Sequence, residues 1–591
     1  MSTVENIYRY PIKGFPGERL KQAMLRPNEG IAGDRAIGLG SGAMAVEGHG
    51  AWTPCQAFQR MTIRPDLTTF QINEDDRDLR LTSPTGISET IDANSSNLDE
   101  LSAAFGGQAS IHRATGNRGY WDHQDATISI INLSTVESIA KMAGRPIDPL
   151  RFRANIYVCA EPWSEFQWLG TRLGIGDAQF DVIRPIDRCK TTSVDVKTGR
   201  TDLNMPALLI RHFGHMFCGV YATVHTSGTI VPGAKIETRE HLQGHQVKAA
   251  ANVSTAPALP DWPRPAVVER TVEEAEAIRS LWIRDSLWET GVMEGFKAGQ
   301  FIRIHNLSES HTWRSYTVSA VKDDLLRITV KRDEGVGSNA IHQVVEGGNL
   351  IITGPFGEAT LNKNSNALHF MSAGIGITPT AVKLAELAQQ DYDKPVHVTH
   401  VARKGQELAL WDDIVTAANA LPNAVTRLYL TRDVVGVAGA QSGRPDLQAL
   451  AQRAKEDAAD VHICGPSGFV DSAVAALSQA NVHGERIFLD TFSSPGVETD
   501  MRPIPDSEPI KVTLAQSGVT DYWTPADGTL LDFAEVRGAI IPSHCRAGLC
   551  KTCNCSVLSG TATRLVGTEG EDEKQTLVCT SIPKETLTLD I

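Results

Sequence analysis

The strongest constraint in this sequence is a group of cysteines near its carboxyl end. Cys545, Cys550 and Cys553 follow the spacing C-x4-C-x2-C, and Cys579 comes after 25 further residues. Four thiolates at this spacing can hold a two-iron cluster, and the small residues between them allow a tight loop. A zinc knuckle is the alternative, but zinc sites favour two C-x2-4-C pairs and only one clean pair is present. The spacing therefore predicts four ligands to a 2Fe–2S cluster.

Residues 509–591, which contain these cysteines, resemble plant-type ferredoxin domains over the whole block. The resemblance implies a β-grasp fold. Cys555 alternates with Cys553 along a strand-like segment, so we expect it to point away from the cluster as a buried structural thiol. Five of the ten cysteines lie in the last 47 residues and the others are scattered. That distribution is typical of a metal site in a reducing compartment rather than of a disulfide framework.

The length of the chain excludes a single-domain protein. At 591 residues it exceeds the size at which one core stops growing, so three or four domains are expected. Lysine and arginine number 56 against 70 aspartates and glutamates, a net charge of −14 that argues against a nucleic-acid surface. No apolar run has the length of a membrane span, and the first residues lack the features of a secretory signal. We therefore expect a cytoplasmic protein with no membrane or nucleic-acid partner.

Two segments rich in proline and small residues divide the chain. Between them, short strands alternating with turns give way after Ala367 to repeated strand–helix pairs, which indicates an antiparallel barrel followed by a parallel α/β nucleotide-binding domain. The expected organisation is multidomain: a mainly-β block over 1–245 (a β-barrel plus mixed α/β), a linker over 246–266, an antiparallel β-barrel over 267–363, an α/β domain over 364–493, a linker over 494–508, and the β-grasp domain over 509–591.

The segment RSYT at 314–317 lies in a strand of the expected barrel. An arginine can donate a fork of hydrogen bonds to a phosphate, and a tyrosine ring can pack on an isoalloxazine. The segment resembles the R-x-Y-S/T flavin motif of the ferredoxin reductase family, and GVGSNAIH downstream offers a phosphate contact at a helix start. The resemblance implies a flavin, with FAD favoured over FMN, held by Arg314, Tyr316, Thr317, Gly337 and Ser338.

A glycine-rich segment, SAGIGITP, follows the apolar strand ALHFM. Gly374 and Gly376 allow a close backbone approach, and Thr378 is expected to cap the next helix, which leaves N–H groups free for a dinucleotide. The segment resembles the nicotinamide platform of the same reductase family, together with the triplet Cys464, Gly465 and Pro466 after a later strand.

That second resemblance implies that Cys464 lies near the hydride-transfer position. It also suggests that Phe492 covers the flavin, although packing in the core would explain Phe492 equally well. The family favours NADH as the coenzyme. Arg403, Lys404 and Arg432 follow neighbouring strands, so a 2′-phosphate, and hence NADPH, is not excluded.

Cys189 lies in the segment RCKTTSVDVKTG at 188–199. The segment resembles the R-C-x-x-T-x-V-D-x-x-T-G stretch of MOSC domains (molybdenum cofactor sulfurase C-terminal), notably their amidoxime-reducing branch. YPIK at 10–13, GDR at 33–35 and RFRANI at 151–156 resemble other motifs of that branch, so the likeness spans residues 4 to about 240. A cysteine beside an arginine is expected to have a lowered pKa, and a thiolate suits a high-valent metal. Cys189 is therefore the expected molybdenum ligand, with a buried structural thiol as the alternative.

The resemblance also implies which residues bind molybdopterin, which carries a phosphate and polar pterin edges. The expected cations are Lys13, Arg35, Arg153 and Arg188, and the expected hydrogen-bonding residues are Ser134, Thr135, Asn155 and Thr192. Two departures from the pattern put substrate preference in question, namely Gly14 in place of a serine and Met216 in place of a tyrosine. Asp122, His123 and Asp187 are possible proton donors, although a solvated loop is the preferred role for the first two.

Together these resemblances imply a self-contained molybdenum reductase. Electrons would pass from NADH to flavin, to the 2Fe–2S cluster and then to molybdenum, where a small-molecule substrate with an N-hydroxyl or N-oxide group is reduced without an external redox partner. The main alternative is a reductase that serves a separate oxygenase, as phthalate dioxygenase reductase does, with the MOSC block as an appended module. A third hypothesis makes the MOSC block a sulfur carrier with a persulfide on Cys189.

Overall fold

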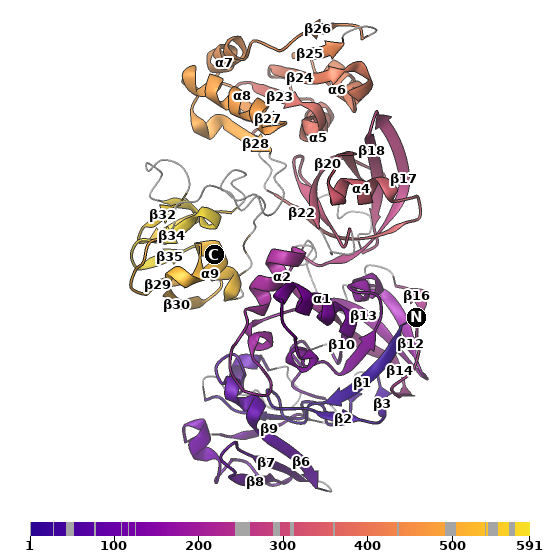
Figure 1. Ribbon diagram of the computed structural model, residues 1–591, viewed down its shortest axis with the longest axis vertical. Coiled ribbons are helices and arrows are strands. Elements are labelled where there is room, and N and C mark those ends of the chain that lie inside the picture. The colour runs from indigo at the N-terminus through magenta and orange to yellow at the C-terminus, as the bar shows by residue number, and fades with distance from the viewer. Residues whose placement is uncertain are drawn as a thin grey trace. The chain divides into compact units, whose positions relative to one another are not determined.

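The computed structural model consists of two compact units, Met1–Pro265 and Ala266–Ile591 (Figure 1). Below, each unit is taken by itself. The residues described are 2–27, 29–42, 53–75, 78–107, 109–115, 118–124, 126–242, 261–287, 296–307, 313–357, 361–433, 437–490, 504–537, 539, 541, 553–565 and 574–591. Most of both expected linkers lies outside them, as do Cys545, Cys550 and Phe492. Among these residues, no helix is long and apolar enough to cross a membrane.

The first unit is built on an eight-stranded sheet of order β16-β12-β13-β14-β10-β11-β1-β2. Its strands are β1 (Thr3–Arg9), β2 (Glu18–Leu20), β10 (Ile128–Asn132), β11 (Ile156–Cys159), β12 (Thr171–Ile175), β13 (Ala178–Asp187), β14 (Phe217–Thr226) and β16 (Ile236–His241). The sheet curls, because Val4 N donates to Ala234 O at 2.9 Å and Ile236 N to Ser2 O at 3.0 Å. These bonds join the start of β1, the strand next to one end of the order, to the first residue of β16 at the other end and to the chain just ahead of it.

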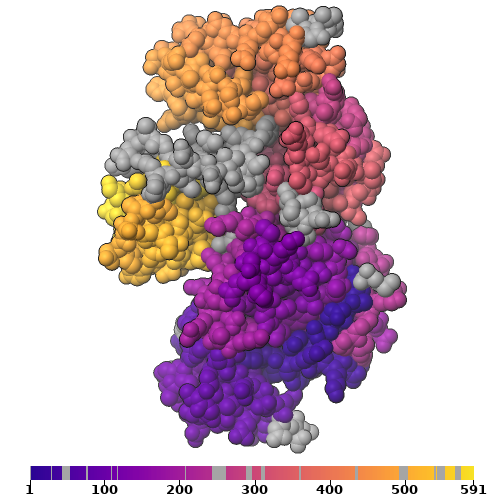
Figure 2. All heavy atoms as spheres, viewed as in Figure 1, coloured from indigo at the N-terminus to yellow at the C-terminus, as the bar shows by residue number. Residues whose placement is uncertain are grey.

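Smaller elements complete this unit. A three-stranded sheet of β6 (Gln71–Asp75), β7 (Asp78–Thr82) and β8 (Ser88–Ile91) forms a lobe at one end of it, drawn as purple spheres in Figure 2. The remaining strands are β3 (Ala23–Arg26), β4 (Gly30–Ile31), β5 (Ile37–Leu39), β9 (Ile111–Arg113) and β15 (Gly228–Ile230). Helix α1 (Leu133–Ala143) begins where the Asn132 side chain accepts from Ser134 N, and it ends at Gly144 with φ 65°. Helix α2 spans Met205–Phe213.

The second unit begins with the expected antiparallel barrel. Six strands close in the order β17-β18-β21-β20-β19-β22: β17 (Arg264–Ala275), β18 (Ile278–Asp285), β19 (Phe301–His305), β20 (Arg314–Lys322), β21 (Leu325–Lys331) and β22 (Asn349–Phe356). Alternate strand residues fill the interior, among them Ile283, Ile304 and Ile328. Helix α4 (Val336–Gln343) follows β21.

A parallel six-stranded sheet follows, in the order β26-β25-β24-β23-β27-β28. The strands are β23 (Leu368–Ala373), β24 (Val396–Lys404), β25 (Ala424–Asp433), β26 (Ala440–Ser442), β27 (Asp460–Cys464) and β28 (Ile487–Asp490), with helices α5 (Ile377–Gln389), α6 (Trp411–Asn419), α7 (Leu447–Glu456) and α8 (Ser467–Gln479) between them. The strand order reverses at β23, whose neighbours are β24 and β27. In sheets of this kind, ligands bind outside the carboxyl ends of the strands at such a reversal.

Polar contacts join the barrel to this α/β domain. Arg327 pairs with Asp413 at 2.6 Å and Lys331 with Glu407 at 2.8 Å. Helix α5 also packs against β20.

The last domain has the β-grasp arrangement that the sequence predicts. Its sheet has the order β30-β29-β35-β31-β33, from β29 (Ile510–Leu514), β30 (Val519–Trp523), β31 (Asn554–Ser559), β33 (Gln575–Leu577) and β35 (Leu587–Leu589), and β32 (Ala562–Arg564) pairs with β34 (Ser581–Pro583). Helix α9 (Leu530–Val536) starts with a capping box between Thr529 and Asp532. Trp523 and Phe533 fill the core.

One buried ion pair holds the Cys189 loop in the first unit. Arg151 is 1% exposed, and its guanidinium contacts Asp195 at 2.9 Å and Asp202 at 2.7 Å. The same side chain donates to Ser193 O at 3.3 Å. This arginine therefore fixes the backbone that follows Cys189, because all three partners come from the chain after that residue.

We predict that Arg151→Ala lowers the free energy of unfolding of the first unit by about 3 kcal/mol, because the substitution removes the buried ion-pair partner of Asp195 and one of the two partners of Asp202. Arg145→Ala is the matched control. Arg145 pairs with Asp202 at 2.6 Å, but its side chain is 43% exposed, so the loss should stay below about 1 kcal/mol. Urea titrations followed by tryptophan fluorescence would measure both, and equal losses would contradict this role for Arg151.

The difference in unfolding free energy between wild type and Arg151→Ala should depend on pH. The hydrogen bond from Arg151 lowers the pKa of Asp202 from its ordinary 3.8, so the unfolded chain binds the proton more readily than the folded one. The stabilisation is therefore present above about pH 4 and is lost as the pH falls through the lowered pKa. The difference between wild type and Arg151→Ala should shrink over that interval.

Candidate functional site

Cys189 lies two residues beyond β13, at the start of a short 3-10 turn over Lys190–Ser193. Its carbonyl oxygen accepts hydrogen bonds from Thr192 N at 3.2 Å and from Thr192 Oγ1 at 2.9 Å. Cys189 itself is exposed. Thr192 thus shapes the turn that presents the thiol, and it does so from a buried position.

The pKa of Cys189 is raised, which contradicts the expectation from the neighbouring arginine. Desolvation by the surrounding protein raises it most, and the charges of Asp122 and Asp187 add to the effect. Arg188 turns away, since its guanidinium donates through Nε to Cys218 O at 2.7 Å and through Nη1 to Phe152 O at 3.2 Å. Adjacency in sequence therefore does not make Arg188 a charge partner of the thiol.

Asp122 lies in an exposed loop, as expected, but its carboxylate also pairs with a residue of this site. Its carboxylate accepts a 2.7 Å hydrogen bond from Lys13 Nζ, which also donates to Tyr120 O at 2.7 Å. Burial acts to raise the pKa of Asp122, but Lys13 and Arg35 outweigh it and hold the pKa well below its usual range. Asp122 therefore stays ionised at neutral pH and is no proton donor there.

Asp122 and Cys189 share a further property. Each is exposed to solvent, the Asp122 side chain at 57%, yet each is strongly desolvated by the protein around it. The charge of Asp122 acts on the Cys189 thiol, so the thiol and the Lys13–Asp122 pair lie close enough to interact.

Two arginines add positive charge near the Lys13–Asp122 pair. Arg35 and Arg153 both have left-handed backbones, at φ 52° and 53°, and both guanidinium groups lie over the Tyr10 ring, at 4.9 and 4.5 Å from its centroid. Arg35 pairs with Asp34 and donates to Arg153 O at 2.9 Å. Arg153 has no hydrogen-bond or ion-pair acceptor among the described residues, and burial lowers its pKa most, with Arg35 adding to the effect.

The remaining residues expected to bind molybdopterin have partners within the protein. Asn155 Oδ1 accepts from Ser129 Oγ at 2.9 Å, and Thr135 Oγ1 donates to Glu165 at 2.9 Å. Ser134 lies in the first turn of α1, with its hydroxyl 3.8 Å from Cys159 Sγ. In this structure Asn155 and Thr135 therefore connect elements of the first unit, and Arg188 does the same.

In the barrel, the flavin motif meets the start of α4. Gly337 lies so close to Arg314 that a Cβ there would approach Arg314 Cγ at 2.7 Å and Tyr316 Oη at 3.4 Å. Arg314 Nη1 donates to Trp313 O at 2.8 Å, and burial raises the pKa of Tyr316, which therefore stays protonated. These three residues of the expected flavin set therefore lie together.

Ser338 and Thr317 complete the expected flavin set. Ser338 Oγ bonds to the Asp333 carboxylate and lies 3.1 Å from Gly335 O, so this hydroxyl holds the turn ahead of α4. Gly335 N also donates to Asp333 at 2.7 Å, which places a carboxylate at the amino end of that helix. Thr317 pairs with Phe301 across the barrel strands.

The two nicotinamide motifs meet at the backbone. Strands β23 and β27 are parallel neighbours, with Ser372 opposite Cys464. A Cβ on Gly376 would lie 2.4 Å from Cys464 O and 2.7 Å from Gly465 N, so only glycine fits. The contact lies at the carboxyl ends of both strands, where the strand order reverses.

The prediction that Thr378 caps α5 is wrong. The residue before the helix is Gly376, and no side chain caps it. Thr378 lies inside the first turn, where its hydroxyl donates to Ile375 O at 3.2 Å. The first N–H groups of α5 therefore face the strand ends without a side-chain acceptor, and those of α8, which follows Pro466, also lack one. Gly374, with φ 55°, makes the turn between β23 and this helix.

Cys464 is a protonated thiol at this junction. It is 2% exposed, and burial, with a contribution from Asp490, raises its pKa well above the usual range. The buried Lys383 lies nearby, and it pairs with Asp490 at 2.8 Å.

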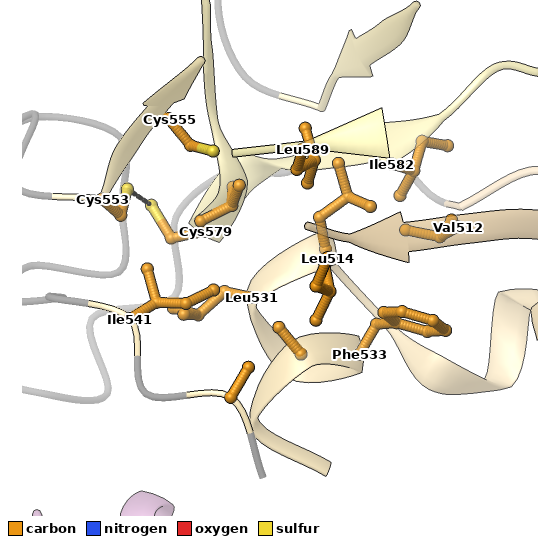
Figure 3. Packing of buried hydrophobic residues seen from close by; sticks show 14 of the residues in the cluster. Val512, Leu514, Leu531, Phe533, Ile541, Cys553, Cys555, Cys579, Ile582 and Leu589 are labelled. Atoms are coloured by element: carbon orange, nitrogen blue, oxygen red, sulfur yellow. Dashed lines mark hydrogen bonds between the residues drawn. The ribbon is translucent and has the colours of Figure 1, made fainter. Parts of the chain in front are cut away.

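In the last domain, two of the four predicted cluster ligands are described. Cys553 Sγ and Cys579 Sγ face each other at 3.0 Å, too far apart for a disulfide bond (Figure 3). Both residues are buried, whereas Cys545 and Cys550 lie outside the described residues. Cys555 is also buried, and its sulfur is apart from the pair and 3.4 Å from Ser556 O. The expectation of a structural thiol at Cys555 is confirmed, and burial raises its pKa to about 11.

Sequence reasoning missed the roles of Asp122 and Tyr10 and assigned none to Arg151. Tyr10 lies in the motif YPIK and Arg151 in the motif RFRANI, so the sequence indicated that the two residues belong to motifs of the first unit but not what they contact. Asp122 lies in a loop with no motif of its own, and only the fold brings it to Lys13, 109 residues earlier.

Comparison with protein families identifies three domains. A MOSC domain matches residues 110–237, an oxidoreductase NAD-binding domain matches 370–475, and a 2Fe-2S iron-sulfur cluster binding domain matches 513–584. The order of the last two is that of phthalate dioxygenase reductase.

Curated relatives match the reductase part of the chain. A flavohemoprotein of Deinococcus radiodurans is 30% identical over 239 residues, which is 39% of this chain and 59% of that protein. The NADH oxidoreductase HCR of Escherichia coli is 26% identical over 50% of this chain and 88% of its own length. The ferredoxin reductase component of 3-ketosteroid-9-alpha-monooxygenase from Rhodococcus rhodochrous is 26% identical over 50% and 85%. The chain thus spans less than two thirds of the flavohemoprotein.

The similar solved structures also match only part of the chain. Phthalate dioxygenase reductase is 21% identical, with a TM-score of 0.33, and the match covers 55% of this chain and 97% of that one. The flavohemoglobin of Malassezia yamatoensis, solved with FAD and heme, is 24% identical, with a TM-score of 0.35 and coverage of 39% and 60%.

We predict that Gly376→Ala disrupts the contact between the two nicotinamide motifs. The added methyl group meets backbone atoms that cannot move independently, so the domain should lose about 1–3 kcal/mol of stability and the KM for NADH should rise. Gly468→Ala is the control, because a Cβ there, in the first turn of α8, has nothing within 4 Å. Dye reduction by NADH and thermal unfolding measure both variants, and matching behaviour would contradict the prediction.

A second prediction concerns the Cys189 thiol. Asp122→Asn removes a negative charge that raises the thiol pKa, so metal-free protein should be alkylated faster by iodoacetamide at a fixed pH near 8. Asp187→Asn should act in the same direction. Mass spectrometry of the Cys189 peptide against time gives the rates. An unchanged rate in Asp122→Asn would mean that this carboxylate does not act on the thiol.

Proposed function

Because the chain joins a MOSC domain to an NAD-binding oxidoreductase domain and a 2Fe–2S domain, we propose that it is a self-contained NADH-dependent reductase of N-hydroxylated or N-oxide compounds. The proposed terminal site is a molybdenum ion held by molybdopterin in the first unit. One observation carries the proposal. The single cysteine of the MOSC motif interacts with Asp122 of the Lys13–Asp122 pair, and Asp122 also interacts with Arg35 and Arg153, of which Arg153 has no ion-pair partner among the described residues.

The residues present fit such a cofactor. Arg153 has a guanidinium group without an acceptor, fixed over the Tyr10 ring, and it can bind a phosphate by two parallel hydrogen bonds. Arg35 lies beside it but shares its charge with Asp34, so it adds to the positive field more than to direct contact. Lys13, which pairs with Asp122, contributes a third cation. Molybdopterin carries the anionic phosphate that this arrangement would neutralise.

Cys189 supplies the soft ligand. A bound molybdenum ion would provide a Lewis acid and an oxygen acceptor for the N–O bond of the substrate. The thiol must release its proton to become a ligand, and its raised pKa means that the proton is present until a metal displaces it. Asp122 is ionised beside Lys13 and Arg35, so it reduces the net positive charge of this group of residues.

The reductase half is proposed to bind FAD and NADH. The flavohemoglobin relative was solved with FAD, and the Escherichia coli relative is an NADH oxidoreductase. Arg314 and Gly337 lie where the strand and the start of α4 meet, which suits a flavin phosphate, and Tyr316 presents a protonated phenol there. The free N–H groups at the start of α5 would face the pyrophosphate of the nicotinamide coenzyme.

Having all the centres on one polypeptide has a physical advantage. A hydride donor, a one-electron cluster and a two-electron metal site each handle electrons in different numbers, so a chain that carries all of them can connect NADH to an oxidised substrate. Covalent linkage raises the effective concentration of one domain at another. The proposal therefore requires no external redox partner.

The test is anaerobic NADH oxidation by purified, molybdenum-loaded protein with a panel of hydroxylamines, amidoximes and N-oxides. Wild type should turn over these acceptors. Cys189→Ala should lose that turnover at least 100-fold while it reduces an artificial dye at the wild-type rate, because dye reduction needs only the second unit. Cys159→Ala is the matched control, since Cys159 is also an exposed cysteine of the first unit and should retain both activities.

Two other outcomes would reject the proposal. If no N-oxygenated acceptor is turned over while an oxygenase partner restores NADH consumption, the chain is a reductase for a separate enzyme. If Cys189 carries a labile 32 Da adduct and no molybdenum is retained, the MOSC domain is a sulfur carrier.

A further inference from the structure

Two histidines and an aspartate meet at the edge of the NAD-binding domain that lies away from the nucleotide site. His369 is the second residue of β23 and His397 the second residue of β24, and the two are partners in the parallel register. Asp457 follows the last turn of α7. All three ligand atoms, one from each residue, lie within 4.8 Å of one another.

The distances match those around a small metal ion. Asp457 Oδ2 is 3.0 Å from His369 Nε2 and 3.5 Å from His397 Nε2. In a tetrahedral zinc site with bonds of about 2.0–2.1 Å, neighbouring ligand atoms are separated by about 3.3 Å. The two separations from Asp457 lie on either side of that value, and the ligand atoms of the two histidines lie within 4.8 Å of each other. Small movements of the side chains would therefore complete the geometry.

A second, independent observation is that His397 makes no hydrogen bond through its ring among the described residues. Both of its ring nitrogens are buried, and neither has a hydrogen-bond partner among the described residues. A neutral imidazole has one donor and one acceptor, and leaving them unsatisfied inside a protein costs free energy. A metal ion bound at Nε2 would satisfy one of the two nitrogens.

The charges around the three residues allow a cation of moderate affinity. Burial lowers the pKa of both imidazoles, that of His369 to about 4, so at neutral pH each ring keeps a lone pair for a metal. Arg453 Nε contacts Asp457 Oδ1 at 3.1 Å and Oδ2 at 2.9 Å. This arginine competes with a cation, but its side chain is 58% exposed and can turn so that it holds Oδ1 alone. Arg427 also repels positive charge at His397, and its effect there is larger than that of Arg453.

We propose that His369, His397 and Asp457 bind a zinc ion, which clasps β23 and β24 to the end of α7. Two imidazoles and a carboxylate suit Zn²⁺, and they are also a known ligand set for Fe²⁺. The position favours zinc. Four residue steps along β23, about 13 Å, separate His369 from Ala373 at the nucleotide edge, so no substrate of the hydride transfer reaches the ion. The site is structural, with water as the fourth ligand.

The experiment uses the full chain with its iron–sulfur cluster assembled, dialysed against micromolar ZnCl₂. Metal analysis should find one more equivalent of zinc in wild type than in His397→Gln or Asp457→Asn. His483→Gln is the matched control, because His483 is an exposed histidine of the same domain, and this variant should bind as wild type does. Cysteines that take up zinc elsewhere contribute equally to all four proteins, so the difference isolates this site.

A second measurement does not depend on the folding of the variants. Crystals of the wild-type protein grown with zinc should give an anomalous peak at the zinc edge between His369 Nε2, His397 Nε2 and Asp457 Oδ2. Zinc should raise the melting temperature of wild type and of His483→Gln but not of His397→Gln, and NADH-dependent dye reduction should be unchanged. Equal zinc content in all the proteins, an absent peak, or selective binding of Fe²⁺ would overturn the proposal and leave a hydrogen-bonded polar cluster in its place.

Discussion

The first unit is organised around positive charge that its own carboxylates only partly neutralise. Arg35 has Asp34, Lys13 has Asp122, and Arg153 has only the face of Tyr10. Holding two guanidinium groups beside one aromatic ring is unfavourable unless an anion joins them, and burial already lowers the pKa of Arg153. A site with this imbalance is prepared for a negatively charged ligand. The Cys189 thiol meets this group of charges through Asp122, which adds to the effect of desolvation on the thiol pKa.

The second unit depends on a different constraint, which is steric. Gly376 and the Cys464–Gly465 backbone approach each other so closely that no side chain fits between them. This contact brings the ends of β23 and β27 together and leaves the first turn of α5 facing outward with its N–H groups uncapped. The nucleotide site that we propose would therefore be formed mostly by backbone, and its expected residues follow a short glycine pattern in the sequence.

The features that sequence predicted well are those carried by local patterns. The alternation of strands and turns located the barrel, the strand–helix repeats located the α/β domain, and the spacing of Cys553 and Cys579 located two thiols that the fold does bring together. Each of these depends on residues whose neighbours in sequence are also neighbours in space, or on a motif that records a known arrangement.

The features that sequence could not predict depend on the register and on distant contacts. The Cys189 pKa was misjudged because Arg188, adjacent in sequence, turns toward Cys218, whereas Asp122 acts on the thiol from another loop. His369 and His397 are 28 residues apart in two apolar strands, and Asp457 comes 60 residues later. Nothing in their spacing indicates a site until the parallel register places the two rings with centroids 4.7 Å apart. The position of a helix cap is also hard to predict, because a helix that begins one or two residues earlier places the expected cap, here Thr378, inside its first turn.

The raised thiol pKa values described above have a consequence for durability. Oxidation of cysteine proceeds through the thiolate, so a thiol kept protonated resists peroxide. Cys189, Cys218, Cys464 and Cys555 all have raised pKa values, with desolvation as the largest cause. A chain built for redox chemistry on a reduced flavin and an iron–sulfur cluster would meet reactive oxygen species at its own centres. By burying or enclosing these sulfurs, the fold protects them from the by-products of its own chemistry.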